Sequence, residues 1–187
     1  MSSHSVRLNP LLTSTPADHR YYAPVPVQWD VRDKASIALR SCAPKTPLSS
    51  SQLAQHATIP AIPSLRINCD VISASWPIVA YNPAGVTIRD IMETINAAVR
   101  TPLHMAEWQS LNPKQQRRIG DIFEERWRTS QDQWRVRTGG VRRMDCLIST
   151  TMFGGLSFLT CANNQWTAVL TLSRQTRRHR LTSYSQS

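Results

Sequence analysis

Residues 85–100 read GVTIRDIMETINAAVR, the most strongly patterned stretch of the chain. Five apolar side chains recur there at the spacing of one helix face: Ile88, Ile91, Met92, Ile95 and Val99. Thr87 can cap the first turn with its hydroxyl, and Asp90 completes a capping box three residues later. Pro102 ends the helix, because proline lacks an N–H and disfavours a helical residue before it. The sequence therefore predicts an amphipathic helix whose apolar face is buried in a core.

Two strands are predicted directly before this helix. Residues 65–71, LRINCDV, alternate apolar and polar side chains, as a half-buried strand does. Residues 78–81, IVAY, form the second strand, and the turn at 82–85 leads into the helix. The local order is therefore strand, strand, helix.

Two further helices are predicted after residue 102. Residues 103–111 can form a short helix that places three side chains near the core: Leu103, Ala106 and Trp108. Pro113 starts a longer helix over residues 114–129, because proline is favoured at the first helical position. The apolar stripe of that longer helix is Ile119, Ile122, Phe123 and Trp127.

The C-terminal third predicts three strands. Residues 141–149, VRRMDCLIS, follow a Gly139-Gly140 turn and alternate like a strand, with Met144, Cys146 and Ile148 on one side. Residues 156–161 and 166–172 are rich in β-formers and flank an Asn-Asn turn, which predicts a hairpin.

These elements predict an α+β fold, a mostly antiparallel sheet with two to three helices packed on one face. The opening strand pair followed by a helix invites comparison with a β-grasp. Residues 65–173 form the predicted core. Residues 1–64, rich in proline and serine, are expected to be an extended, largely disordered arm. Its docking segment is the alternating VQWDVR at 27–32, and residues 174–187 are expected to be a basic, disordered tail.

Composition favours an acidic partner. The chain of 187 residues has a formal net charge of +10, and only Lys34, Lys45 and Lys114 are lysines. Arginine dominates, and its planar fork suits bidentate contacts with carboxylates and phosphates. The sequence shows no secretory signal and no apolar run long enough to span a membrane. An intracellular protein of the cytoplasm, the nucleus or both is expected.

A spaced set of short motifs resembles an uncharacterised family of small domains that is abundant in basidiomycete, mushroom-forming fungi. The matching motifs are WDVR at 29–32, PSLRI at 63–67, WPI at 76–78, GVTIRD at 85–90, EW at 107–108, GVRRMD at 140–145 and FGGL at 153–156. The resemblance covers residues 27–172 and implies a fungal source and an intracellular domain. The family carries no established activity, so it implies no catalytic residue.

No motif of a catalytic or metal site is present in the sequence. The four cysteines have no metal-ligand spacing and are interpreted as free thiols, and no Gly-x-Ser-x-Gly elbow or phosphate-binding loop occurs. Cys146 paired in space with a histidine, and a metal held by His104 and Glu107, are weaker alternatives. We therefore expect no cofactor, no metal and no catalytic residue.

One candidate network combines arginines, aspartates and a tryptophan from two distant segments. Its members are Trp29, Asp30, Arg32, Arg142, Arg143 and Asp145. The first interpretation is a buried Arg–Asp network that docks the arm. The second is a site for a small anionic ligand or an acidic peptide.

The basic tail supplies a second candidate, a set of phosphate contacts: Arg174, Arg177, Arg178 and Arg180. Three functions follow from these features. The first hypothesis is a non-enzymatic protein-interaction module with an unknown protein partner. The alternative is a basic protein that binds nucleic acid non-specifically through its tail, and the second alternative is an enzyme whose site is not visible in the sequence.

Overall fold

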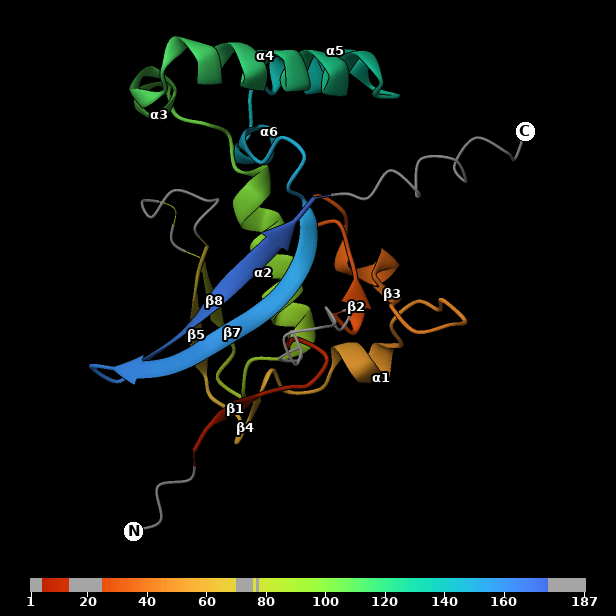
Figure 1. The fold of residues 1–187 in the computed structure, drawn as a ribbon, viewed down its shortest axis with the longest axis vertical. Coiled ribbons are helices and arrows are strands. Elements are labelled where there is room, and N and C mark those ends of the chain that lie inside the picture. Colours follow the sequence, from red (N-terminus) through yellow and green to blue (C-terminus); the bar gives the residue numbers. More distant parts are fainter. Residues whose placement is uncertain (1–4, 14–24, 70–75, 77, 175–187) are drawn as a thin grey trace, which may run out of the picture.

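The computed structural model of the chain describes residues 5–13, 25–69, 76 and 78–174 (Figure 1). The strands are β1 Arg7–Leu8, β2 Val27–Gln28, β3 Leu39–Arg40, β4 Thr58–Ile59, β5 Ser64–Asn68, β6 Ile78–Tyr81, β7 Met152–Ala162 and β8 Gln165–Ser173. The helices are the 3-10 turn η1 Ala35–Ile37, α1 Ser50–Leu53, α2 Ile88–Arg100, α3 Met105–Ser110, α4 Pro113–Arg128, α5 Gln133–Thr138 and α6 Arg143–Cys146.

The main sheet has four strands in the order β6-β5-β8-β7. The outer pairs β5–β6 and β7–β8 are antiparallel, whereas the central pair β5–β8 is parallel. The α+β class and the mostly antiparallel sheet are therefore confirmed. The first and last strands of the sheet lie side by side at its centre, which agrees with the β-grasp comparison.

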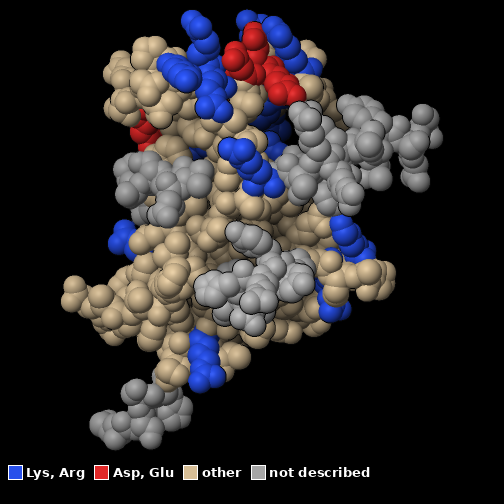
Figure 2. All heavy atoms as spheres, in the orientation of Figure 1, with Lys and Arg blue, Asp and Glu red and all other residues tan. Residues whose placement is uncertain are grey.

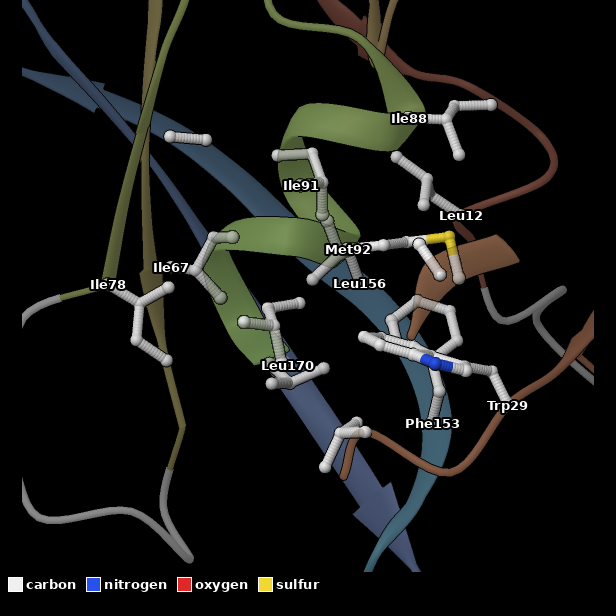
Figure 3. Close-up of a cluster of buried hydrophobic side chains, with 14 of the residues drawn as sticks. Leu12, Trp29, Ile67, Ile78, Ile88, Ile91, Met92, Phe153, Leu156 and Leu170 are labelled. Atoms are coloured by element: carbon white, nitrogen blue, oxygen red, sulfur yellow. The ribbon is translucent and has the colours of Figure 1, made fainter. Parts of the chain in front are cut away.

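Helix α2 forms as its sequence predicts and supplies one wall of the core. The Thr87 hydroxyl accepts from the backbone N–H of Asp90 at 3.2 Å, and the Asp90 carboxylate accepts from the N–H of Thr87 at 2.8 Å. All five side chains of the predicted stripe are buried. Figure 3 shows Ile91 and Met92 packed among Leu156, Leu170 and other side chains of the sheet.

The predicted hairpin is also confirmed, with β7 and β8 joined at Asn163 and Asn164. Both asparagines have positive φ, 49° and 61°, as a two-residue hairpin turn of the primed type requires. The strands are longer than predicted, because pairing continues from Met152 with Ser173 to Ala162 with Gln165.

The described part of residues 1–64 differs from the expected disordered arm. Trp29 is 2% exposed and its ring lies 5.9 Å from that of Phe153. Backbone hydrogen bonds from Phe153 to Trp29 and from Val31 to Thr151 tie the docking segment to β7, although only its first two residues are a strand. Further buried apolar side chains come from the same region: Leu12, Val27, Ala35, Ala38, Leu48, Leu53, Ala57 and Ile62. This buried area offsets the entropy cost of ordering the segment.

The prediction of a strand over residues 141–149 is wrong, because the short helix α6 forms there. Met144 and Leu147 are buried, at the three-residue spacing of a helix, and Ile148 has a positive φ of 56°. The Asp145 carboxylate accepts from the N–H of Arg142, which closes the first turn. A short alternating run could not reveal this capping contact.

Helices α3, α4 and α5 lie beyond one end of α2 rather than on the face of the sheet (Figure 1). Of the three side chains predicted near the core around α3, Leu103 packs against it. The prediction is wrong for the other two, because Ala106 is exposed and Trp108 is only half-buried outside the core cluster. Helix α4 buries only Ile119 of its stripe. None of the described helices is long and apolar enough to cross a bilayer.

Candidate functional site

The six residues of the predicted network fall into separate clusters. Trp29, Asp30 and Arg32 lie beside the start of β7. Arg142, Arg143 and Asp145 lie on or just before α6, beneath α4 and α5. Among the described residues, no hydrogen bond or ion pair joins the two sets.

The Asp30 cluster lies where the docking segment meets the start of β7. Arg32 Nε and Nη2 donate to the Asp30 carboxylate at 2.9 and 2.7 Å, and the Thr151 hydroxyl donates to it at 3.0 Å. Trp29 Nε1 donates to the Asp33 carbonyl at 3.0 Å. Every one of these contacts stays within the segment or joins it to the residue before β7.

Asp145 is the most deeply buried charged group among the described residues, with 1% exposure. Its carboxylate accepts from Arg126 Nε at 2.7 Å and from Arg126 Nη2 at 2.8 Å, a bidentate pair. Arg126 Nη2 also donates to the Gly140 carbonyl at 3.0 Å. The pair therefore joins α4 to the Gly139-Gly140 turn and to α6.

Arg143 belongs to a third cluster, with Glu107 and Trp76. Its Nη2 lies 3.2 Å from Glu107 Oε1, and its guanidinium carbon lies 4.6 Å from the centre of the Trp76 ring. Trp76 Nε1 and the His104 backbone N–H also donate to the Glu107 carboxylate. Desolvation raises the pKa of this carboxyl, but these hydrogen bonds and the charge of Arg143 lower it by more.

The proposed metal pair His104 and Glu107 gains no support from this geometry. The Glu107 oxygens already accept three different donors, so they are not arranged around an open position. Among the described residues, no group of three potential metal ligands occurs.

Arg142 has no side-chain hydrogen bond to any described residue, and its Nε is buried. Desolvation lowers the pKa of this guanidinium, and the positive charges of Arg126, Arg100 and Arg135 lower it further. Asp145 acts in the opposite direction but is already engaged by Arg126. Arg142 therefore sits in a surplus of positive charge.

Helices α4 and α5 carry an aromatic–arginine surface, which we define as Phe123, Trp127, Arg128, Trp134 and Arg137. The guanidiniums of Arg128 and Arg137 lie 5.5 and 5.2 Å from the Trp127 ring centre. Trp134 is 77% exposed. Figure 2 shows basic and acidic side chains gathered at this end of the molecule.

Cys146 is not poised as a nucleophile. Burial raises the pKa of its thiol to about 11, and the charges of Asp145 and Glu107 add to the effect. The reactive thiolate is therefore a minor species at neutral pH.

Of the predicted tail contacts, only Arg174 is described, and it is exposed. Arg177, Arg178 and Arg180 lie outside the described residues.

Arg126 is the main residue of these clusters that the sequence did not indicate. It follows Ile119 by seven positions, so it continues the apolar stripe of α4, and a charge on that stripe was the available signal.

Comparison with protein families gives one match. A family model described as a family of unknown function (DUF6699) matches residues 27–168, more than half of the chain. The chain belongs to the DUF6699 family.

The DUF6699 match begins at β2 and ends within β8, so it includes the docking segment, both buried ion pairs and the aromatic–arginine surface. It confirms the resemblance to a domain family of unknown function. No curated protein and no solved structure matches the chain.

Proposed function

We propose that this DUF6699 chain is a non-enzymatic protein-interaction module that binds an acidic segment of a partner protein through its aromatic–arginine surface. The observation that carries the proposal is the exposure of an apolar stripe. Ile122, Phe123 and Trp127 are only half-buried on α4, and Trp134 on α5 is 77% exposed. Tryptophan and arginine are the residues most enriched among those that dominate binding energy at interfaces.

Charge selects the kind of partner. Residues 113–138 contain seven lysines and arginines and four aspartates and glutamates, which leaves a net charge of +3. An acidic protein segment with one or two large apolar side chains complements such a surface.

One feature favours a protein over a nucleic acid at this surface. Two guanidiniums already lie over the Trp127 ring, which would otherwise be a stacking platform for a base. Binding of nucleic acid through the tail stays the alternative hypothesis.

Two carboxylates of this end of the molecule have structural partners, which supports binding rather than catalysis. Asp145 and Glu107 are each engaged by an arginine and by a backbone N–H, and these contacts join the helices to one another. We retain a fungal source and a cytoplasmic or nuclear location as expectations from the sequence.

A peptide-library selection on the full chain tests the proposal. We expect enrichment of acidic peptides with aromatic or aliphatic residues, and at least about tenfold weaker binding of the best peptide to Trp134→Ala. The matched control is Phe158→Ala, because Phe158 is 79% exposed on the β7–β8 hairpin and outside the surface. Enrichment of peptides without acidic residues, or equal losses in both variants, would contradict the proposal, as would preferential binding of single-stranded RNA.

A further inference from the structure

The Arg142 side chain has no hydrogen-bond acceptor among the described residues. Its Nε is buried and makes no hydrogen bond to a described residue. Arg143 Nε is also buried without an acceptor, but the Arg143 guanidinium lies over Trp76 and donates to Glu107. The Arg142 side chain has no such partner in the described part of the chain. A buried donor without an acceptor is costly, so an acceptor that arrives with a ligand would relieve that cost.

Three further arginines, Arg126, Arg100 and Arg135, lie near enough to Arg142 for their positive charges to lower its pKa. A bridge between Pro102 and Arg142 brings the latter beside the C-terminal end of α2, which carries Arg100. Arg126 and the N–H of Arg142 share the Asp145 carboxylate. A Cβ built on Gly139 would lie 3.2 Å from the Arg135 carbonyl and 3.3 Å from Arg142 Nη2.

The Gly139-Gly140 turn adds no side chain beside the Arg142 guanidinium, because both of its residues are glycines. Gly140 has a φ of +67°, a conformation that favours glycine, and a Cβ there would meet nothing within 4 Å. The turn also directs the Gly140 carbonyl to Arg126. The Gly139-Gly140 turn therefore lies close to the guanidinium groups of both Arg142 and Arg126.

The charge balance indicates a divalent anion. The charges that act on Arg142 are those of Arg100, Arg126 and Arg135 and that of one carboxylate, Asp145, so the group of four arginines and one aspartate has a net charge of +3. Asp145 is saturated by Arg126, and Arg100 donates to the Arg32 carbonyl, so Arg142 and the exposed Arg135 supply the available donors. A phosphoryl group carries about −1.5 to −2 charges at neutral pH and offers three acceptor oxygens.

We propose that these four arginines form a phosphoryl-binding site in which Arg142 donates directly to the anion, Arg135 closes over it, and Arg100 and Arg126 contribute charge. The site shares no residue with the aromatic–arginine surface, although Arg126 lies over the Phe123 ring of that surface at 5.2 Å. Phosphoryl binding does not depend on the function proposed for that surface. The phosphoryl group can come from free phosphate or from a phosphorylated side chain, since both present the same oxygens.

The test is an NMR titration of the full-length, ¹⁵N-labelled chain with inorganic phosphate, at an ionic strength held constant with sodium chloride. We expect saturable shifts at the Arg142 Nε–H signal and at the Gly139 and Gly140 amides. Arg142→Gln should weaken binding at least about tenfold, the size expected for losing a charge-assisted contact. Arg118→Gln is the matched control, because it removes an exposed charge from α4 outside the site.

Arg135→Gln keeps the test decisive if the Arg142 variant does not fold. Arg135 is exposed, so its substitution should leave the core intact and weaken phosphate binding about threefold. A phosphoserine peptide and its unphosphorylated form distinguish the sources. Tighter binding of the phosphopeptide than of phosphate would assign the site to a modified side chain, and equal binding would assign it to the free anion. Shifts that do not saturate, or that are equal in Arg118→Gln and in both site variants, would overturn the proposal.

Discussion

At the scale of single residues, two carboxylates organise the end of the molecule that carries the candidate surface. Asp145 binds Arg126 and closes the first turn of α6, while Glu107 binds Arg143 and caps α3. Both ion pairs join helices to one another rather than to the sheet. Each carboxylate therefore has a measurable effect on how α3–α6 are held together.

Asp145→Asn should destabilise the protein by about 3 kcal/mol, because it leaves the partly buried Arg126 charge without its partner. Equilibrium unfolding in urea measures the difference. The exposed i,i+4 pair of Glu124 and Arg128 supplies the control, and Glu124→Gln should cost less than about 0.5 kcal/mol. Equal effects of the two substitutions would show that the buried pair has no special role.

Glu107→Gln should change how stability depends on pH. The pKa of Glu107 lies below its ordinary value in the folded protein, so its carboxylate stabilises the fold above the unfolded-state pKa of about 4.3. That stabilisation is lost as the pH falls through the lowered pKa. The gap in unfolding free energy between wild type and variant should therefore be largest above about pH 5 and shrink in more acidic solution. A gap that does not change with pH would refute this role.

At the scale of elements, α2 depends on the turn that precedes it. Gly85 has a φ of +109°, and a Cβ there would lie 2.8 Å from both Ala61 Cβ and His56 Nδ1. The turn thereby brings the start of α2 against residues 56–61, which belong to the segment expected to be disordered.

Gly85→Ala should destabilise the protein by at least about 2 kcal/mol, from the left-handed conformation and the steric overlap together. Gly120→Ala is the opposite case, since Gly120 lies inside α4 with nothing within 4 Å of a built Cβ. It should stabilise the protein by up to about 1 kcal/mol. Thermal unfolding of both variants checks the pair, and a change of the same sign in both would contradict the account.

The sequence predicted the elements whose signals are local. Helix α2 has a regular stripe and a capping box, and the β7–β8 hairpin has its Asn-Asn turn, so both could be read from neighbouring residues. Helix α6 could not, because its cap depends on one carboxylate that also binds Arg126 from another helix. Four residues of the candidate network carry ion pairs, namely Asp30, Arg32, Arg143 and Asp145, but the partners of Asp145 and Arg143 lie on α4 and α3.

At the scale of the whole molecule, residues 25–64 and the sheet share one core. Val27, Trp29 and Val31 are buried in the same cluster as the stripe of α2 and the inner side of β7 and β8. Their alternation indicated a docking segment, whereas most other buried residues of 25–64 lie in a proline-interrupted stretch without a period, so their burial follows from tertiary contacts. Helices α3–α5 extend beyond this core, which leaves their outer side available to a partner.

Trp29→Ala should therefore destabilise the entire fold, by about 3–5 kcal/mol, the usual cost of removing a large buried aromatic side chain. Ile37→Ala in the neighbouring η1 turn should cost less than about 0.5 kcal/mol, because Ile37 is 57% exposed. Denaturant unfolding followed by tryptophan fluorescence and by circular dichroism should give one coincident transition. Separate transitions would contradict a shared core.

Photo-crosslinking in cell extract tests the central claim most directly. A benzophenone amino acid replaces Trp134 in one full-length variant and Tyr81 in another, two exposed aromatic positions at 77% and 69%, on α5 and on β6. We expect a discrete adduct at position 134 that mass spectrometry identifies as an acidic protein segment, and none at position 81. Equal labelling at both positions, or an adduct with nucleic acid at position 134, would contradict the account.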